Sequence, residues 1–102
     1  MILFNTTFVV AQNADSDFLN WASSIFIPEI NTCESFSDIL LTKILATPQE
    51  DKTLSYALQF KAPSVEHIEN WIASSGMSKL NALQAKYGEN ILYFATLMEI
   101  LQ

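Results

Sequence analysis

Two side chains of types that often act as nucleophiles or general bases each occur once in the sequence. His67 is the only histidine and Cys33 the only cysteine. Because a structural zinc site needs about four nitrogen or sulfur ligands, one chain cannot build one from this pair, and we expect no metal. General base catalysis by His67 would need a partner and a pocket. We therefore interpret His67 as a surface residue near a helix start and Cys33 as a small buried hydrophobic residue.

A second group of polar residues is interleaved with apolar ones along the expected strands and the first expected helix. The group comprises Glu29, Lys43, Gln59, Tyr93 and Glu99. Carboxylates with altered proton affinity cluster at functional sites, so this group could line a pocket. The alternative is structural: an ion pair between Lys43 of one copy and Glu99 of another. Asn5 and Trp71 add hydrogen-bond donors, and the predicted ligand-binding residues are Asn5, Glu29, Gln59, Trp71 and Tyr93.

The length and charge of the chain indicate what kind of domain holds these residues. The 102 residues suffice for a single domain, 1–102, and half of them are apolar. The net charge is −6, from 11 acidic and five basic residues, and all five basic residues are lysines. A chain without arginine makes no bidentate contact to phosphate or guanine, and an acidic surface repels DNA. We therefore expect an acidic domain that binds no nucleic acid.

The N-terminal residues and the single cysteine bear on location. Residues 1–4 are apolar, but no lysine precedes them and Asn5 interrupts them, unlike a signal peptide or a membrane span. A single cysteine excludes a disulfide within the chain, so a disulfide-stapled secreted fold is excluded. The expected location is the cytoplasm, without membrane association.

Hydrophobic periodicity predicts four strands and two helices. The expected strands are 2–10, 39–46, 53–60 and 91–101, and the expected helices run from 16 to 33 and from 64 to 88. A polar turn at 47–52 predicts a hairpin between the second and third strands. Ser64 is a good N-cap, and Gly88 a good C-terminal residue. Pro28 and Gly76 are expected to kink or break the two helices.

The order strand, helix, strand, strand, helix, strand predicts a ferredoxin-like α+β plait, in which two helices cover one face of a four-stranded antiparallel sheet. The other face should then be polar, because it meets water. Whichever side of each strand is turned toward the helices, however, the other face contains both apolar and polar residues. Our assignment gives that face these residues: Leu3, Asn5, Thr7, Val9, Leu41, Lys43, Leu45, Ser55, Ala57, Gln59, Tyr93, Ala95, Leu97 and Glu99. The faces of single strands could be exchanged, since the second is apolar on both. A monomer rarely exposes so much apolar surface, which predicts a homodimer through the sheet face.

Five sequence segments resemble those of a known family. They are Asn5–Thr7, Trp21, Pro28–Glu29, Tyr56–Phe60 and Phe94–Glu99. With them, nearly the whole chain resembles the uncharacterised domain-of-unknown-function family 4286. The resemblance implies a dimeric α/β-barrel fold of ferredoxin-like type and no established activity. More distant relatives in that superfamily include small monooxygenases that work without a bound metal, and haem-degrading enzymes.

Three functions follow as expectations. The first is a homodimeric domain that binds a small apolar or amphipathic ligand on the inner side of the sheet, without a cofactor. The second, implied by the superfamily, is a cofactor-free monooxygenase with Asn5, Trp71 and Tyr93 around its substrate. Haem degradation is disfavoured, because Asn81 stands near the position where those relatives have a histidine. The third is a structural or regulatory interaction module, for which Trp21 and Phe26 would form an exposed patch on the helices.

Overall fold

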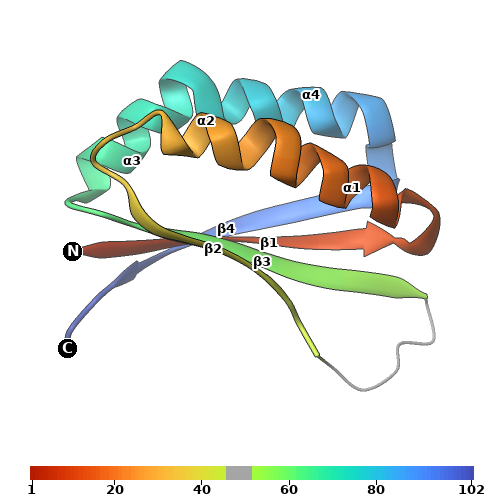
Figure 1. The fold of residues 1–102 in the computed structure, drawn as a ribbon, viewed down its shortest axis with the longest axis horizontal. Helices are drawn as coiled ribbons and strands as arrows, with labels where there is room; N and C mark the ends of the chain where they lie inside the picture. Colours follow the sequence, from red (N-terminus) through yellow and green to blue (C-terminus); the bar gives the residue numbers. More distant parts are fainter. Residues whose placement is uncertain (46–51) are drawn as a thin grey trace.

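Four antiparallel strands form one sheet in the order β2-β3-β1-β4. The strands are β1 (Ile2–Ala11), β2 (Ser37–Lys43), β3 (Thr53–Ala62) and β4 (Ile91–Glu99). The computed structural model describes residues 1–45 and 52–102; apart from Lys52, the turn predicted at 47–52 lies outside them. Both helical segments cover the same face of the sheet, and the opposite face is uncovered (Figure 1). The prediction of a ferredoxin-like α+β fold is confirmed.

The central strands β1 and β3 point their most apolar sides at the helices, as the alternation predicted. Phe4, Phe8 and Val10 of β1 are at most 3% exposed. Their cross-strand partners on β3 include Phe60 and Tyr56, which are also buried. Side chains of adjacent strands that are paired across a ladder share a face. The helix-facing side of the sheet is therefore apolar at its centre, except for the buried side chain of Thr6.

The predicted faces of β2 and β4 are wrong. Tyr93 pairs with Phe8, and Lys43 pairs with Tyr56, so Tyr93 and Lys43 lie on the helix-facing side of the sheet. The same register places Leu41, Ala95, Leu97 and Glu99 on that side. Phe94, which we expected under the helices, lies on the uncovered face. Both sides of these strands carry apolar residues, so alternation alone could not distinguish them; pairing with the central strands decides.

Strand β2 also begins earlier than its predicted start at Ile39. The backbone of Asp38 has a positive φ of 53°, and the pairing with β3 shifts register between Ser37 and Leu40. An extra residue in one strand is the usual sign of a β-bulge. The bulge lets the strand start at Ser37 and still place Leu40 on the uncovered face.

The first helical segment continues through Pro28, but a π-helical turn interrupts its α-helix directly before this residue. A short turn η1 (Gln12–Ala14) leads into α1 (Asp15–Trp21), the π-helical turn η2 (Ala22–Phe26) and α2 (Ile27–Asn31). The N–H of Ile27 bonds to the carbonyl of Ala22, five residues back. This wider turn places Pro28 in the first turn of α2, where a missing N–H removes no α-helical hydrogen bond.

The second helical segment has the same construction. Here α3 (Val65–Trp71), the π-helical turn η3 (Ile72–Gly76) and α4 (Met77–Tyr87) follow one another without a break, and η4 (Gly88–Asn90) ends the segment. The hydroxyl of Ser64 accepts a hydrogen bond from the N–H of His67, as its predicted role as N-cap requires. Gly76 is buried, and an added Cβ would lie 2.6 Å from Cζ3 of Trp71. Gly76 therefore allows close packing of the indole instead of breaking the helix.

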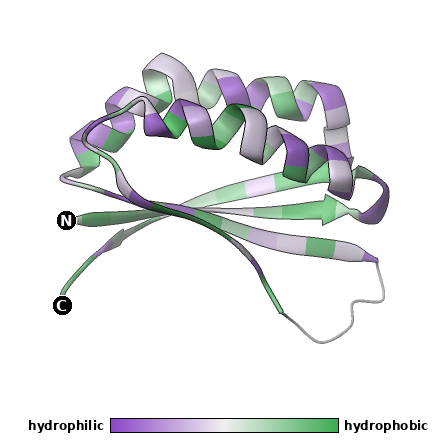
Figure 2. Cartoon of the chain, in the orientation of Figure 1, coloured by the Kyte–Doolittle hydropathy of each residue, from purple (hydrophilic) through white to green (hydrophobic). Residues whose placement is uncertain are grey.

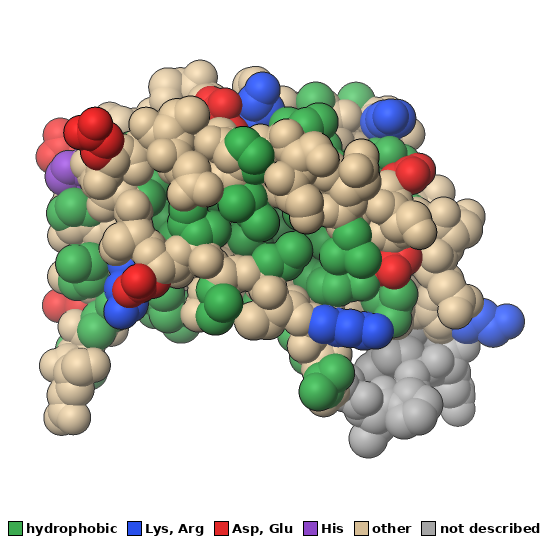
Figure 3. Space-filling view, viewed as in Figure 1, with side chains coloured by type: hydrophobic (Ala, Val, Ile, Leu, Met, Phe, Trp, Pro, Cys, Tyr) green, Lys and Arg blue, Asp and Glu red, His purple; other side chains and the backbone are tan. Residues whose placement is uncertain are grey.

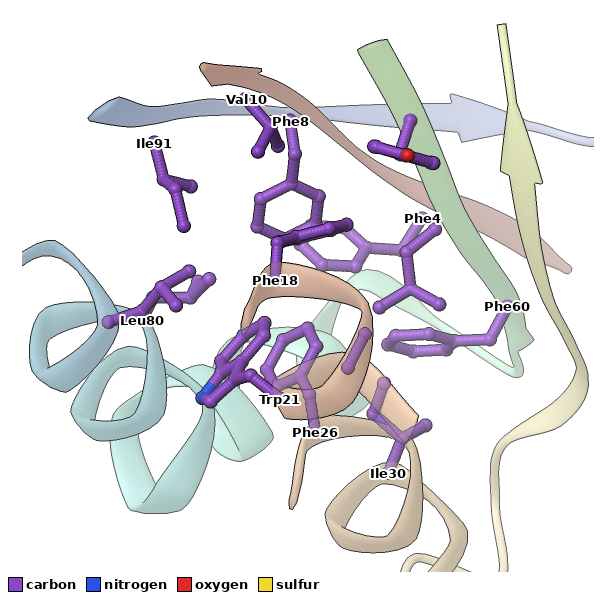
Figure 4. Close-up of a cluster of buried hydrophobic side chains, with 14 of the residues drawn as sticks. Phe4, Phe8, Val10, Phe18, Trp21, Phe26, Ile30, Phe60, Leu80 and Ile91 are labelled. Atoms are coloured by element: carbon purple, nitrogen blue, oxygen red, sulfur yellow. The ribbon is translucent and has the colours of Figure 1, made fainter. Parts of the chain in front are cut away.

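Aromatic rings fill the space between the helices and the sheet. Phe8 of β1, Phe18 of α1, Phe26 of η2 and Phe60 of β3 point toward one another in this layer (Figure 4). The rings of Trp21 and Phe26 stack, with centroids 4.7 Å apart. In a π turn, residues five apart are close on the helix, which brings Phe26 beside Trp21. Both are buried, which contradicts the exposed patch we expected for a helix-side interaction module.

Candidate functional site

The uncovered face of the sheet, called the open sheet face below, contains two of the predicted ligand-binding residues. Strand register assigns it these residues: Leu3, Asn5, Thr7 and Val9 of β1, Ser55, Ala57, Gln59 and Lys61 of β3, Leu92, Phe94, Thr96 and Met98 of β4, and Leu40 and Thr42 of β2. Figure 2 shows that hydrophobic residues occur along these strands, not only in the helices. The face is therefore mixed, as predicted, although β2 and β4 contribute different residues.

Polar side chains form a row across the middle of the open sheet face. Asn5 pairs with Gln59 on one side and with Thr96 on the other. The Asn5 amide nitrogen also donates a hydrogen bond of 3.0 Å to the hydroxyl of Thr7. We call Asn5, Gln59 and Thr96 the polar row. Thr96 was not among the predicted site residues, because its place beside Asn5 depends on the register of β1 with β4.

Large apolar side chains surround the polar row and are exposed. Leu40 is 51% exposed, Leu92 48% and Phe94 58%. Lys61 is the one charged residue assigned to this face among the described residues, and its ammonium lies 3.0 Å from the carboxylate of Asp38. The face thus combines exposed apolar groups, uncharged hydrogen-bonding groups and almost no net charge.

Trp71 and Tyr93 lie on the other side of the sheet, separated from Asn5 and Gln59 by the backbone. The Trp71 indole is 6% exposed and packs against Phe60 with centroids 5.6 Å apart. Its Nε1 is buried without a hydrogen-bond partner in the described part of the chain. Tyr93 is half-buried, and its ring lies 6.2 Å from that of Phe8. The structure therefore does not bring the five predicted ligand-binding residues together within one chain.

The remaining members of the polar group are scattered. Glu29 is half-buried on α2, and its backbone carbonyl accepts a hydrogen bond from the hydroxyl of Thr32. Lys43 and Glu99 are exposed on the helix-facing side of the two edge strands. Because β2 and β4 are opposite edges of the sheet, these two charges do not meet within one chain.

One partly buried hydrogen bond between side chains was not predicted. The hydroxyl of Tyr56 on β3 donates a short hydrogen bond to the carboxylate of Asp15, the first residue of α1. Burial, this hydrogen bond and the negative charge of Asp15 raise the pKa of Tyr56 to about 12. This hydrogen bond connects the start of the first helical segment to strand β3. The two residues are 41 positions apart, so no local sequence pattern could identify the pair.

Two of the grooves formed by the described residues lie beside the helices. The first, called the helix groove below, has a volume of about 410 Å³ and lies between α1–η2 and α4. The second has a volume of about 450 Å³ and is lined by Cys33, His67 and Trp71, among others. His67 is exposed, as predicted, while Cys33 is half-buried, not fully buried. The His67 ring contacts the hydroxyl of Ser64 at 2.7 Å, and no hydrogen bond joins it to Cys33 in the described residues.

Two further observations concern the part of the chain that the structure describes. No three His, Cys, Asp or Glu side chains there are close enough together to hold one metal ion. None of the helices in residues 1–45 and 52–102 combines the length and the apolar character needed to cross a membrane.

Comparison with known proteins gives a family and a fold. The model of the family "Domain of unknown function (DUF4286)" matches residues 1–101. Among curated proteins, no sequence is similar enough to this chain to count as a relative.

Several solved structures share the fold at low sequence identity. A candidate antibiotic biosynthesis monooxygenase from Deinococcus radiodurans superposes with a TM-score of 0.76 at 12% identity, covering 100% of this chain and 94% of that one. SnoaB, a cofactor-independent oxygenase from Streptomyces nogalater, gives 0.59 at 16% identity, with 99% and 93% coverage. A dimeric ferredoxin-like protein from an uncultured marine organism gives 0.50 at 5% identity, with 99% and 96% coverage. At such identities the likeness establishes the fold alone.

Proposed function

Because this chain belongs to the DUF4286 family, whose function is unknown, we propose its function from the structure: it is a binding domain that works as a homodimer joined through the open sheet face. The observation that carries this proposal is the exposure of Leu40, Leu92 and Phe94 on one uncovered face of the sheet. Monomeric proteins rarely expose contiguous apolar patches larger than a few hundred Å². A partner that covers this face would remove the patch from water.

A second copy of the chain suits this face better than a charged partner. The chain has a net charge of −6. In the described part of the open sheet face, however, the only charged residue is Lys61, which forms an ion pair with Asp38. Two such faces therefore meet with little like-charge repulsion. A two-fold axis through the polar row would place the amides of Asn5 and Gln59 opposite those of the partner, on two sides of a shared space between the sheets. A solved protein with a similar fold is described as a dimeric ferredoxin-like protein, which supports a dimer without specifying its interface.

The ligand would then lie on the inner side of the sheet, between the two copies. Asn5, Gln59 and Thr96 would supply hydrogen bonds, while Phe94 and Leu40 would contact its apolar part. Ligand sites typically combine an apolar lining with a few convergent polar groups. An amphipathic small molecule would match this lining, and it is one of the two ligand classes expected from the sequence.

The monooxygenase alternative has less support from the residues. This chain resembles SnoaB and the Deinococcus radiodurans protein in its fold alone. The expected donors lie on different sides of the sheet: Trp71 and Tyr93 lie in the layer between the helices and the sheet, whereas Asn5 lies on the open sheet face. The observations therefore favour a binding domain over an oxygenase.

Sedimentation equilibrium combined with an amphipathic ligand screen by thermal shift tests the proposal. We expect a dimer at micromolar concentrations and a stabilising ligand whose effect is reduced in Asn5→Ala. A chain that remains monomeric at several hundred micromolar would overturn the homodimer. A dimer whose ligand response is identical in Asn5→Ala and in the unaltered chain would overturn the proposed place of the ligand.

A further inference from the structure

The helix groove lies on the side of the molecule opposite the open sheet face and is independent of the proposed dimer. Residues of α1 and η2 form one wall, and residues of α4 form the other. The two walls are far apart in sequence, so the groove exists only because the two helical segments lie beside each other on the sheet (Figure 1). Its volume of about 410 Å³ lies in the range of small-molecule sites in proteins.

Apolar and aromatic side chains form the inner surface of the helix groove. Trp21 and Leu83 line it but are 9% and 2% exposed, so they form its floor. Ile25 is 46% exposed on one wall, and the half-buried ring of Tyr87 lies on the other. A planar aromatic group has a suitable surface here, because aromatic rings pack favourably against indole and phenol rings.

The local structure of the first helical segment produces this floor. Trp21 directly precedes the π turn η2, and Ile25 lies within it. Phe26 stacks on Trp21 from the core side and holds the indole in place. Single π turns within α-helices occur frequently at functional sites. The indole is therefore fixed before any ligand arrives.

Two lysines give the α4 wall a positive charge. Lys79 and Lys86 both line the groove, and they are seven residues, or about two helical turns, apart on α4. Figure 3 shows lysine side chains over the helix layer. The only ion pair among residues 1–45 and 52–102 joins Lys61 and Asp38, so neither groove lysine has a carboxylate partner there. Instead, the Lys86 ammonium lies 5.4 Å from the centre of the Tyr87 ring.

The facing wall carries the opposite polarity. Asp17 and Asn20 of α1 line the groove, and Asp17 is the one carboxylate among its lining residues. A carboxylate accepts hydrogen bonds from a hydroxyl group but repels a second negative charge. A ligand that matches both walls has one anionic end toward α4 and one hydrogen-bond donor toward α1.

From these features we propose that the helix groove binds a small aromatic carboxylate with a hydroxyl group at its other end. The aromatic part would lie over Trp21 and Leu83. Lys79 and Lys86 would contact the carboxylate, and Asp17 would accept a hydrogen bond from the hydroxyl group. This site is distinct from the ligand position between two sheets proposed above.

The test uses 6-hydroxy-2-naphthoate as the probe and its neutral primary amide as the matched control compound, with binding measured by isothermal titration calorimetry. We expect the acid to bind with a dissociation constant below about 1 mM, in line with a ligand of this size. The amide should bind about fivefold to tenfold more weakly, because contacts between charges at an exposed site are modest. Equal affinities for acid and amide, or no binding of the acid at several millimolar, would overturn the proposal.

Variants locate the site. The double variant Lys79→Gln/Lys86→Gln should lower the affinity for the acid to that for the amide. The control double variant, Lys43→Gln/Lys52→Gln, removes the same charge outside the groove and should leave both affinities unchanged. If both double variants weaken binding of the acid equally, the lysines act through net charge and the proposed site is wrong.

A variant that fills the helix groove with a large side chain tests the site without changing its charge. Ala82 is an exposed residue that lines the groove, so Ala82→Trp should fill the space without disturbing the core. We expect this variant to lose binding of both compounds while its thermal unfolding stays near that of the unaltered chain. Phe94→Lys, on the open sheet face, should bind the acid normally even if the dimer is lost. Binding that survives Ala82→Trp, or is lost in Phe94→Lys, would place the ligand elsewhere.

Discussion

Replacing Phe94 with alanine is the sharpest test of the proposed dimer. Phe94 has the largest exposed fraction, 58%, among the apolar side chains assigned to the open sheet face. A fully buried aromatic side chain removes about 200 Å² from water, so covering the exposed part of Phe94 removes about 115 Å². At about 25 cal/mol per Å², this burial contributes about 3 kcal/mol per copy.

A two-fold dimer contains the contact twice, which gives an upper limit of about 6 kcal/mol for both copies. Alanine retains part of the apolar area, and surfaces rarely match completely, so we expect a loss of about 4 kcal/mol. That loss corresponds to a dissociation constant about a thousandfold higher. The free energy of unfolding of the single chain should change by less than about 0.5 kcal/mol, because the side chain is exposed there.

Sedimentation equilibrium from about 1 to 500 μM measures the dissociation constant, a range chosen for typical dimer affinities. Leu97→Ala is the matched control, because Leu97 is 47% exposed on the same strand but on its helix-facing side. This variant should dimerise like the unaltered chain. The reasoning is refuted if Phe94→Ala and Leu97→Ala weaken the dimer equally, since the open sheet face would then have no special part in it.

Three further predictions concern stability. Gly76→Ala should destabilise the chain by about 1–2 kcal/mol in urea unfolding, because the new Cβ overpacks against the fixed Trp71 ring, which outweighs the gain in helix propensity. Since the pKa of Tyr56 is raised to about 12 from an ordinary value of 10, the folded chain binds this proton more tightly than the unfolded chain. The resulting stability is complete below pH 10 and is lost between pH 10 and 12. Tyr56→Phe should not show this loss of stability when both proteins are unfolded in urea across that pH range, and an identical pH dependence would contradict the raised pKa of Tyr56. Ser64→Ala should lower the free energy of unfolding by about 1 kcal/mol through loss of the N-cap, as measured by thermal unfolding against an exposed mid-helix control, Ser78→Ala.

The sequence by itself determined the order of elements, the α+β plait and the inward faces of the two central strands. One side of β1 carries Phe4, Phe8 and Val10, whereas the other side includes Asn5 and Thr7, so local periodicity was enough to orient the strand. It also predicted that the second sheet face would be mixed, because two helices in so short a chain cover only one face. The alternation of residues along the two central strands also placed Asn5 and Gln59 on that second face.

Only the tertiary structure decided which sides of the edge strands face the helices, because Phe94 and Tyr93 are both apolar enough for either side and the pairing of β4 with β1 makes the choice. Pro28 and Gly76 suggested breaks, but each helical segment continues through a π turn that follows a buried tryptophan, Trp21 or Trp71. The helix groove and the contact between Tyr56 and Asp15 join residues distant in the chain. Local pattern reports which residues seek burial, whereas such long-range contacts exist only once the whole chain has folded.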